Sequence, residues 1–522
     1  MPRARIVTIA LGLLILSTWI TPWGRDLFVG DETKYGRVVR EMRSTGAFFL
    51  PTLNGVPFTH KPPLHFWMID LLTIPLGLHS TWAFVLPSLA AFLFLLWLMW
   101  RMGGPLAAFV CGTSLMVWAS SQTARMDVFF TALIALGLWQ LQRFLEEGER
   151  NGLIFCGVSL GMATLVKGPM APVIGLMVLL LHFARRRTLP PGPYGRAAVA
   201  MIAIPLAWFI PAVLLGGEAY AREIVVKQTV GRAIASWVHH APPWFYLAHM
   251  PAALFPWFFP GVVALLALWR VRPFLIDWIL AVLIPYSAMS SKLDVYMMAL
   301  IPPVALLIAD LADRCALEDA DPAGIIPGIL PHPAKQTRRL RVANALSIAL
   351  VALIGVVGLF ASPRWIHGPE SELLTHGNVR LFFAMSAMVG IVSLTASLRA
   401  TVRNSTLLAG ATPVMMMVML AILLMPEVNA ISSTRPLVEA LQQLNIPPAE
   451  TALYAAPYLW TRDLPVPLEN VVYADIETLR RRRPSVIVTA RAHAGEIAFA
   501  LAGYRKTAEL RMIGKWFDVY QR

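Results

Sequence analysis

Apolar runs long enough to cross a lipid bilayer recur from one end of this chain to the other. The first, IVTIALGLLILSTWI, begins near the N-terminus, and similar runs follow to about residue 425. A helix of about 20 apolar residues spans the hydrocarbon core and satisfies its own backbone hydrogen bonds there. Only 14% of the 522 residues are charged, against about 25% in soluble domains. The pattern predicts an α-helical polytopic membrane protein.

The apolar runs predict thirteen membrane-spanning helices. Arg3 and Arg5 precede the first run, as in a signal peptide, but no small-x-small cleavage site follows it, so we expect a retained span. The predicted spans cover residues 6–23, 81–100, 105–122, 128–145, 152–166, 168–184, 198–215, 251–269, 274–289, 296–311, 343–361, 380–398 and 405–425.

Clusters of arginine indicate which side of the membrane each loop occupies. Four of them fall on the same side as the N-terminus if the thirteen spans are counted correctly. Cytoplasmic loops carry the excess of lysine and arginine, so this side is predicted to be cytoplasmic. The four clusters lie at residues 185–187, 270–272, 338–341 and 399–403. The other, periplasmic side receives two long loops, about residues 24–80 and 216–250, and the C-terminal tail.

The tail differs from the rest of the chain in its pattern. RPLVEALQQL has helical periodicity, and TALYAA, NVVYAD and SVIVTA are short strand-like runs. We therefore expect two domains, a transmembrane domain at residues 1–425 and a small periplasmic α/β domain at residues 426–522.

The net charge of +14 does not indicate nucleic acid as a partner. The cations are spread over many short loops, and no long basic tail or basic patch interleaved with aromatic residues is present. Membrane lipids with anionic head groups are the expected partners of such a surface.

The remaining polar residues gather on one face of the predicted membrane domain. Ionisable groups at the hydrocarbon boundary are costly and usually functional, and lysine and arginine on a periplasmic face oppose the usual charge bias. A phosphate group is the simplest ligand for these cations. The residues are Asp31, Glu32 and Lys61 in the first long loop, Arg125 and Asp127, Lys167, His239 and His240 in the second long loop, and Lys292 and Tyr296.

Each of these residues also has a purely structural interpretation. Asp31 and Glu32 are typical of the start of a helix, here one running to about Ser44, where the helix dipole favours carboxylates. The lysines, the histidines and the Arg125–Asp127 pair are also typical of side chains that reach the interface from the end of a span. The convergence of six segments on one face favours a shared site.

Six segments of the chain follow the pattern of a known family. They are GDETKYGRVVREM, FFLPTLNGVPFTHKPPLHFW, TARMDVFF, LVKGPMAP, WVHHAPPWFY and SSKLDVYMMALIPP. Through them the chain resembles the bacterial aminoarabinose transferases within the protein O-mannosyltransferase-like superfamily of membrane glycosyltransferases. The resemblance extends in order over most of residues 5–311, and beyond residue 312 it is one of architecture. It implies a GT-C-type fold with about thirteen transmembrane helices, amphipathic loop helices in the periplasm and a small C-terminal α/β domain.

The resemblance implies transfer of a sugar from undecaprenyl phosphate to an acceptor at the periplasmic face of the bacterial inner membrane. The acceptor is a lipid A phosphate in the aminoarabinose enzymes and a Ser or Thr hydroxyl in the protein mannosyltransferases. Carried over by position, the catalytic acids are Asp31 and Asp127. The donor-phosphate residues are Lys34, Lys61, Lys167, Arg125, Tyr296 and Lys292. Glu32 adjoins the first acid, and His60, His239 and His240 lie near a metal position.

The chain departs from the family pattern at three positions. His60 stands where the aminoarabinose enzymes have the metal-binding glutamate of EKPP, and Phe58 stands where they often have tyrosine. Asp294 replaces the proline of the SKLPxY motif. The departures leave open whether a divalent metal binds and which sugar is transferred.

Other classes of function stay open at the level of the sequence. A protein O-glycosyltransferase of the same family differs only in its acceptor. A lipid or solute transporter places ionisable residues near the middle of the membrane, and Asp277 inside the ninth span fits that class. A non-catalytic membrane scaffold needs no convergent carboxylates and lysines.

Overall fold

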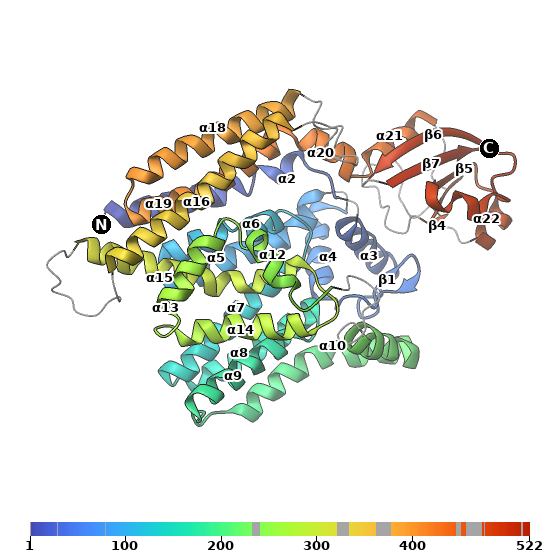
Figure 1. The fold of residues 1–522 in the computed structure, drawn as a ribbon. Coiled ribbons are helices and arrows are strands. Elements are labelled where there is room, and N and C mark those ends of the chain that lie inside the picture. Colours follow the sequence, from blue (N-terminus) through green and yellow to red (C-terminus); the bar gives the residue numbers. More distant parts are fainter. Residues whose placement is uncertain are drawn as a thin grey trace.

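A body of long helices carries a small sheet-containing unit at one end (Figure 1). The structure is a computed structural model that describes residues 2–28, 30–78, 80–231, 241–320, 333–361, 377–444, 450–455, 472–473, 476–512 and 515–522. The N-terminus lies at the end of the body opposite the sheet, and α3, α4 and β1 lie on the side of the sheet.

The helical body contains the predicted membrane spans. Its helices are α1 (Pro2–Ser17), α2 (Thr21–Gly24), α5 (Thr81–Gly112), α6 (Leu115–Ser121), α7 (Asp127–Glu147), α8 (Arg150–Lys167), α9 (Met170–Arg186), α10 (Tyr194–Arg222), α12 (Phe245–Ala253), α13 (Phe258–Leu268), α14 (Pro273–Ala288), α15 (Ile301–Ala320), α16 (Pro333–Phe360), α18 (Gly377–Arg399) and α19 (Val402–Leu423). A π-helix, η1 (Glu223–Gly231), follows α10, and a 3-10 helix, η2 (Asp294–Leu300), precedes α15.

Every predicted span coincides with one of these helices or with a pair of them. In the described part of the chain, eight helices are long and apolar enough to cross a membrane, or nine if the bent pair α12 and α13 forms one span. Shorter apolar helices such as α14 fall below that length. The molecule is therefore a multi-pass membrane protein, and the number thirteen stays a prediction.

One long helix of this set is a hairpin of two helices. Gly103 and Gly104 have non-helical dihedral angles inside α5, and Gly104 has a φ of 77° and a ψ of −176°. A Cβ atom on Gly112 would lie 2.7 Å from Leu96 and 3.4 Å from Phe92, so the second segment returns along the first. The predicted spans 81–100 and 105–122 therefore meet at this turn, which explains why α5 counts once by length.

The loop after the first span folds into two helices and a short hairpin. These are α3 (Asp31–Thr45), β1 (Thr52–Leu53), β2 (Val56–Pro57) and α4 (Leu64–Leu76). The buried Glu41 of α3 accepts hydrogen bonds from Thr52 Oγ1 at 2.7 Å and from the backbone N–H groups of Asn54 at 2.7 Å and Gly55 at 3.0 Å. Glu41 thus ties the hairpin turn to the helix that begins at Asp31.

The C-terminal unit is a mixed five-stranded sheet with helices. It consists of α20 (Met425–Ser432), α21 (Arg435–Leu444), β3 (Thr451–Tyr454), β4 (Val472–Tyr473), α22 (Ile476–Arg482), β5 (Val486–Ala490), the 3-10 helix η5 (Arg491–Ile497), β6 (Arg505–Met512) and β7 (Lys515–Gln521). The strand order is β4-β3-β5-β7-β6, with β3 parallel to β4 and β5. The three strand-like runs of the sequence form β3, β4 and β5. The charged strands β6 and β7 were not predicted.

Polar contacts join the linker of this unit, by which we mean residues 429–435, to the first loop. Arg435 donates to both carboxylate oxygens of Asp26, at 2.8 and 3.0 Å, and Ser433 Oγ donates to the same carboxylate at 2.9 Å. Asn429 accepts from the Asp26 backbone N–H at 3.0 Å and donates to the Gly24 carbonyl at 2.8 Å. The segment that follows the last span therefore lies beside the segment that follows the first span.

Candidate functional site

The first predicted catalytic acid begins helix α3. Gly30 precedes it with a φ of 125° and a ψ of −118°, a conformation that L residues avoid. Lys34 Nζ donates to Asp31 Oδ1 at 2.6 Å, and Arg125 Nη2 lies 3.6 Å from Asp31 Oδ2. The Asp31 side chain remains 36% exposed, so one carboxylate is held between two cations and still faces an open site.

The surroundings of Asp31 keep its carboxylate ionised. Burial, the largest single influence, raises the pKa of Asp31, but Lys34, Arg125 and Lys61 together outweigh it, so the pKa lies below its ordinary value of 3.8. The position in the first turn of α3 also favours the charged form through the helix dipole.

The second predicted acid begins helix α7 and is more deeply placed. Arg125 Nε donates to Asp127 Oδ2 at 3.0 Å, and Lys167 Nζ donates to Asp127 Oδ1. The side chains of Asp127 and Lys167 are only 5% and 8% exposed. Lys167 is the last residue of α8, and Gly168, with a φ of 100°, turns the chain into α9.

These contacts form one row of alternating charges, which we call the ion chain: Lys34, Asp31, Arg125, Asp127 and Lys167. Arg125 is its centre because its guanidinium reaches both carboxylates. Lys61 acts electrostatically on both acids from the first loop. Four cations against two carboxylates leave these six groups with a net positive charge.

A cavity of about 570 Å³ adjoins the ion chain and has a lining of mixed polarity. Its polar lining residues include Lys61, Lys167 and Tyr296, together with Thr59, His60 and Ser291. Its apolar lining residues come largely from α9 and α10, among them Pro205, Leu206, Trp208 and Phe209. In the apolar stretch of α10 only 11% of the residues are buried inside the protein, so this helix borders the membrane.

The ring of Tyr296 contacts two other residues that line the cavity, Tyr286 and Lys167. Its ring stacks on Tyr286 with a centroid separation of 4.9 Å, and the Lys167 ammonium lies 4.7 Å from its centroid. Asp294, which replaces the proline of the SKLPxY motif, forms a hydrogen bond with His249 Nδ1 at 2.7 Å. This pair attaches the motif to α12.

Lys292 is placed differently from the other predicted phosphate ligands. Its buried ammonium donates to the carbonyl oxygens of Tyr286 at 3.3 Å, Ser287 at 2.9 Å and Met289. These carbonyls belong to the end of α14, where a cation complements the helix dipole. Burial lowers the pKa of Lys292. Lys292 is not among the described residues that line the cavity, so we assign it to capping α14.

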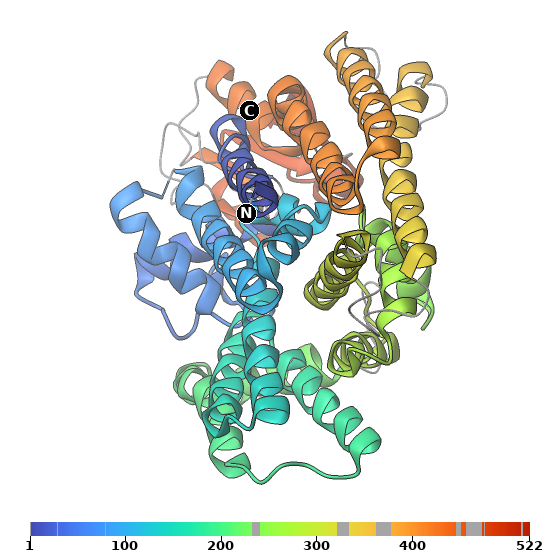
Figure 2. The same cartoon turned by 90° about the vertical axis from the view of Figure 1, so that its left-hand side faces the viewer.

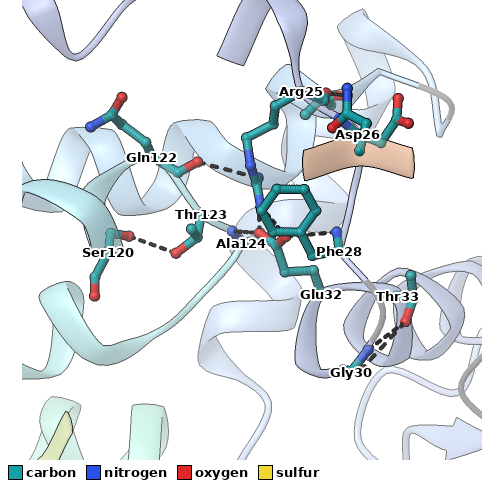
Figure 3. A network of polar contacts seen from close by, with 12 residues as sticks. Arg25, Asp26, Phe28, Gly30, Glu32, Thr33, Ser120, Gln122, Thr123 and Ala124 are labelled. Atoms are coloured by element: carbon teal, nitrogen blue, oxygen red, sulfur yellow. Dashed lines mark hydrogen bonds and ion pairs between the residues drawn. The ribbon is translucent and has the colours of Figure 1, made fainter. Parts of the chain in front are cut away.

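Glu32 belongs to a separate polar network with Arg25, Phe28 and Ala124 (Figure 3). Its buried carboxylate forms an ion pair with Arg25 and accepts from the backbone N–H groups of Phe28 at 2.9 Å and Ala124 at 2.5 Å. Arg25 also donates to the Gln122 carbonyl at 3.3 Å. Glu32 therefore fixes the start of α3 against the turn that carries Arg125.

The metal position implied by the resemblance stays a prediction. Among the described residues, no three His, Cys, Asp or Glu side chains gather in one place. His60 lines the cavity, and its ring lies 5.2 Å from that of Phe58. The predicted ligands His239 and His240 lie outside the described residues.

The sequence did not single out several residues that hold the site. Arg25 positions Glu32, Glu41 fixes the hairpin, and Asp26 anchors the C-terminal linker. Arg25 and Asp26 follow the first apolar run directly, and a charged pair at that position was the available signal. Their partners are distant in sequence, so the pattern alone does not identify them.

The carboxylate within the ninth predicted span has a local partner. Arg185 Nη1, in the last turn of α9, lies 2.5 Å from Asp277 Oδ1, in the first turns of α14. Asp277 therefore forms an ion pair beside the arginine cluster at residues 185–187. Its position at a helix end does not match the mid-membrane site expected of a transporter.

Comparison with known proteins gives matches in sequence and in fold. Residues 60–209 match the family model described as dolichyl-phosphate-mannose-protein mannosyltransferase. The undecaprenyl phosphate-alpha-4-amino-4-deoxy-L-arabinose arabinosyl transferase of Serratia proteamaculans is 26% identical over 59% of this chain and 59% of its own length. A second such transferase from Pseudomonas fluorescens is 28% identical over 74% of this chain and 71% of its own. The chain thus aligns with little more than half the length of the first of these relatives.

A solved structure extends the likeness over the whole fold. The crystal structure of ArnT from Cupriavidus metallidurans bound to undecaprenyl phosphate superposes with a TM-score of 0.74 and 17% sequence identity, and covers 98% of this chain and 97% of its own. This likeness confirms the predicted GT-C-type fold. Together with the curated relatives, it shows that this chain is similar to the bacterial aminoarabinose transferases in sequence and in fold.

Proposed function

We propose that this chain is a membrane glycosyltransferase that moves a sugar from undecaprenyl phosphate to lipid A or a related envelope glycolipid. The observation that carries the proposal is the cavity of about 570 Å³, which is lined both by the cations Lys61 and Lys167 and by apolar residues of the membrane-facing helix α10. The relatives named as undecaprenyl phosphate sugar transferases support it.

The cationic and the apolar lining residues match the phosphate and the tail of a polyprenyl phosphate donor. The tail lies against the apolar residues of α9 and α10, and it enters sideways from the membrane. Lys61 and Lys167 bind the phosphate, and Lys34 and Arg125 reinforce their charge from the ion chain. Tyr296 also lines the cavity and orients the bound phosphate.

The chemistry follows from the charges. The bond between the anomeric carbon and the phosphate oxygen breaks, and the electron pair stays on the phosphate. Lysines in a partly dry site stabilise this developing charge more strongly than they would in water. The anomeric carbon becomes electron-poor, and a nearby carboxylate stabilises it. Asp31 is ionised and remains accessible for this role.

The acceptor attacks the opposite face of the anomeric carbon, so we expect inversion. A phosphate acceptor on lipid A needs no deprotonation, and Asp31 then orients it. A hydroxyl acceptor needs a general base, which Asp31 also provides. The second possibility corresponds to a protein O-glycosyltransferase, and the match of residues 60–209 to a protein mannosyltransferase model favours keeping it as an alternative.

The orientation follows from the arginine clusters. We place the N-terminus in the cytoplasm. The ion chain, the loop at about residues 24–80 and the unit after residue 425 lie in the periplasm. The position of α3 and the sheet at the end opposite the N-terminus supports this assignment (Figure 1).

A reconstituted transfer assay tests the proposal. The purified chain in lipid nanodiscs is mixed with an undecaprenyl-phosphate-linked sugar and lipid A, and free undecaprenyl phosphate and sugar-modified lipid A are measured. We expect both products from the wild type and a loss of at least a hundredfold in rate for Lys167→Met. Donor turnover with a peptide acceptor and none with lipid A would favour the alternative acceptor. No turnover of any polyprenyl-linked sugar would contradict the proposal.

A further inference from the structure

The charges around the cavity restrict which sugar fits it, if the proposed function holds. Among the described residues that line it, Lys61 and Lys167 are cations and no residue is an aspartate or a glutamate.

The nearest carboxylates are already engaged by cations. Asp127 receives hydrogen bonds from both Arg125 and Lys167, and its side chain is 5% exposed. Asp31 lies between Lys34 and Arg125. Glu223 of η1 lies 2.9 Å from Lys227, accepts from Gln228 at 3.2 Å and also interacts electrostatically with His60 of the lining. A cationic group on a bound sugar would therefore compete with protein cations for every one of these acids.

The charge balance leads to the same result. The six groups of the ion chain and Lys61 carry a net charge of +2, from four cations and two carboxylates. A polyprenyl phosphate monoester released by the reaction carries a charge of about −2 at neutral pH, as phosphate monoesters do. The site is thus neutralised by the leaving group alone. A protonated amino group on the sugar would add a positive charge with no counter-charge.

The residues beside the phosphate position suit an uncharged sugar. Thr59, Ser291 and Tyr296 line the cavity and carry hydroxyl groups, each of which can donate to or accept from a sugar hydroxyl. His60 precedes Lys61 in the sequence and also lines the cavity. Its imidazole is either neutral or a further cation. From this lining we infer that the sugar transferred by this chain carries no cationic amino group, in contrast to the amino sugar in the names of its relatives.

A matched pair of donors tests the inference. Undecaprenyl phosphate–arabinose and its 4-amino-4-deoxy analogue have the same shape and differ only in a hydroxyl against an ammonium group. Equilibrium binding of each donor is measured by competition against labelled undecaprenyl phosphate, on the whole chain in nanodiscs. We expect the hydroxyl donor to bind at least about tenfold more tightly, the factor expected for one unpaired charge in a partly buried site.

Two substitutions at His60 sharpen the experiment. His60→Glu adds a carboxylate to the lining, so the preference for the hydroxyl donor should shrink at least about tenfold. His60→Gln, of similar size and uncharged, should keep the preference. Equal or tighter binding of the amino donor by the wild type would overturn the inference and leave the proposed function intact. If undecaprenyl phosphate itself does not bind, the proposed function fails, and this inference fails with it.

Discussion

Two adjacent carboxylates at the start of α3 have different surroundings because their side chains leave the helix in different directions. Asp31 is held between Lys34 and Arg125, and its side chain stays 36% exposed. Glu32 points inward, pairs with Arg25 and receives two backbone N–H groups. The sequence DE at a helix start is equally compatible with either role for either residue. Only the packing of α3 against the turn before α7 distinguishes them.

Lys34 sets the protonation of Asp31. The pKa of Asp31 is lowered in the folded protein, so its carboxylate stays charged until the pH falls below the ordinary range, and loses its charge only in stronger acid. In Lys34→Met the largest influence that lowers this pKa is removed, and burial raises it. We expect the acid limb of the transfer rate to move to higher pH, as measured in a pH-rate profile.

Lys506→Met provides the control for this experiment. Lys506 also pairs with carboxylates, Glu509 at 2.5 Å and Asp518 at 2.9 Å, but it lies in the C-terminal unit. Its substitution should leave the profile unchanged. An unchanged profile for Lys34→Met would show that Asp31 does not govern the acid limb.

His65 is a fully buried histidine that lies beside the Ala124 backbone. Burial lowers its pKa from 6.5 to about 4. The unfolded chain therefore binds a proton between these values that the folded chain does not bind, and stability falls as the pH drops from about 6.5 to 4.

We expect His65→Leu to reduce this acid-side loss, by up to about 3 kcal/mol at the acid end, and to leave stability at pH 7 similar or higher. Thermal unfolding in detergent between pH 4 and 7.5 measures it. Parallel curves for the two proteins across this range would contradict the assigned protonation of His65.

At the scale of elements, loops between spans hold the site because they are tied to one another. Glu32 links α3 to the turn at residues 122–126, and Lys167 links the end of α8 to the start of α7. These ties position the ion chain before any ligand arrives. Precise positioning of charged groups is the main contribution of a protein to reactions of this kind.

Glu32→Gln tests the strength of the tie. The substitution leaves the buried Arg25 guanidinium without a charged partner, which costs about 3–5 kcal/mol when the pair is fully buried. The side chains of Arg25 and Glu32 are 2% and 6% exposed. We expect a large fall in the temperature of thermal unfolding.

Glu147→Gln is the matched comparison, since Glu147 pairs with Arg143 at 3.4 Å and its side chain is 58% exposed. Exposed pairs contribute about 0–1 kcal/mol. If both variants unfold at the same temperature, the Arg25–Glu32 pair does not carry the role assigned to it.

Hydropathy predicted the helices well because a span in lipid must be apolar and must form its backbone hydrogen bonds within itself. It located a helix at every predicted span and even the turn at Gly103–Gly104. Counting loops also placed Asp31, Arg125, Asp127 and Lys167 on one face, and the family resemblance added Lys34. It did not predict the role of Lys292, because a lysine at a loop can cap a helix or face a ligand. The strands β6 and β7 were missed because their charged side chains give no apolar run.

At the scale of the molecule, the helical body and the C-terminal unit meet through the first loop. Figure 2 looks at the body from its N-terminal end, and the C-terminal unit lies behind α1 in that view. The Asp26–Arg435 ion pair and the contacts of Asn429 join the linker to the segment that begins the site. Arg25, the next residue along from Gly24, belongs to the network that fixes α3.

The proposed orientation predicts the accessibility of single cysteines. Gly495 is exposed in the C-terminal unit, and Thr188 is exposed beside the arginine cluster at the end of α9. The native Cys111 and Cys156 are buried. In spheroplasts, a membrane-impermeant thiol reagent should label Gly495→Cys and label Thr188→Cys only after lysis. The reverse pattern would place the C-terminal unit in the cytoplasm.

The central claim is that Asp31 and its surrounding cations transfer a polyprenyl-linked sugar to lipid A. The most direct measurement is mass spectrometry of lipid A and polyprenyl phosphates from a bacterial strain without its own transferase of this kind, carrying either the wild-type chain or Asp31→Asn at equal abundance. The account predicts a sugar added to lipid A by the wild type, and unmodified lipid A with accumulated polyprenyl-linked sugar in the variant. Identical lipid A and polyprenyl phosphate pools in the two strains would contradict it.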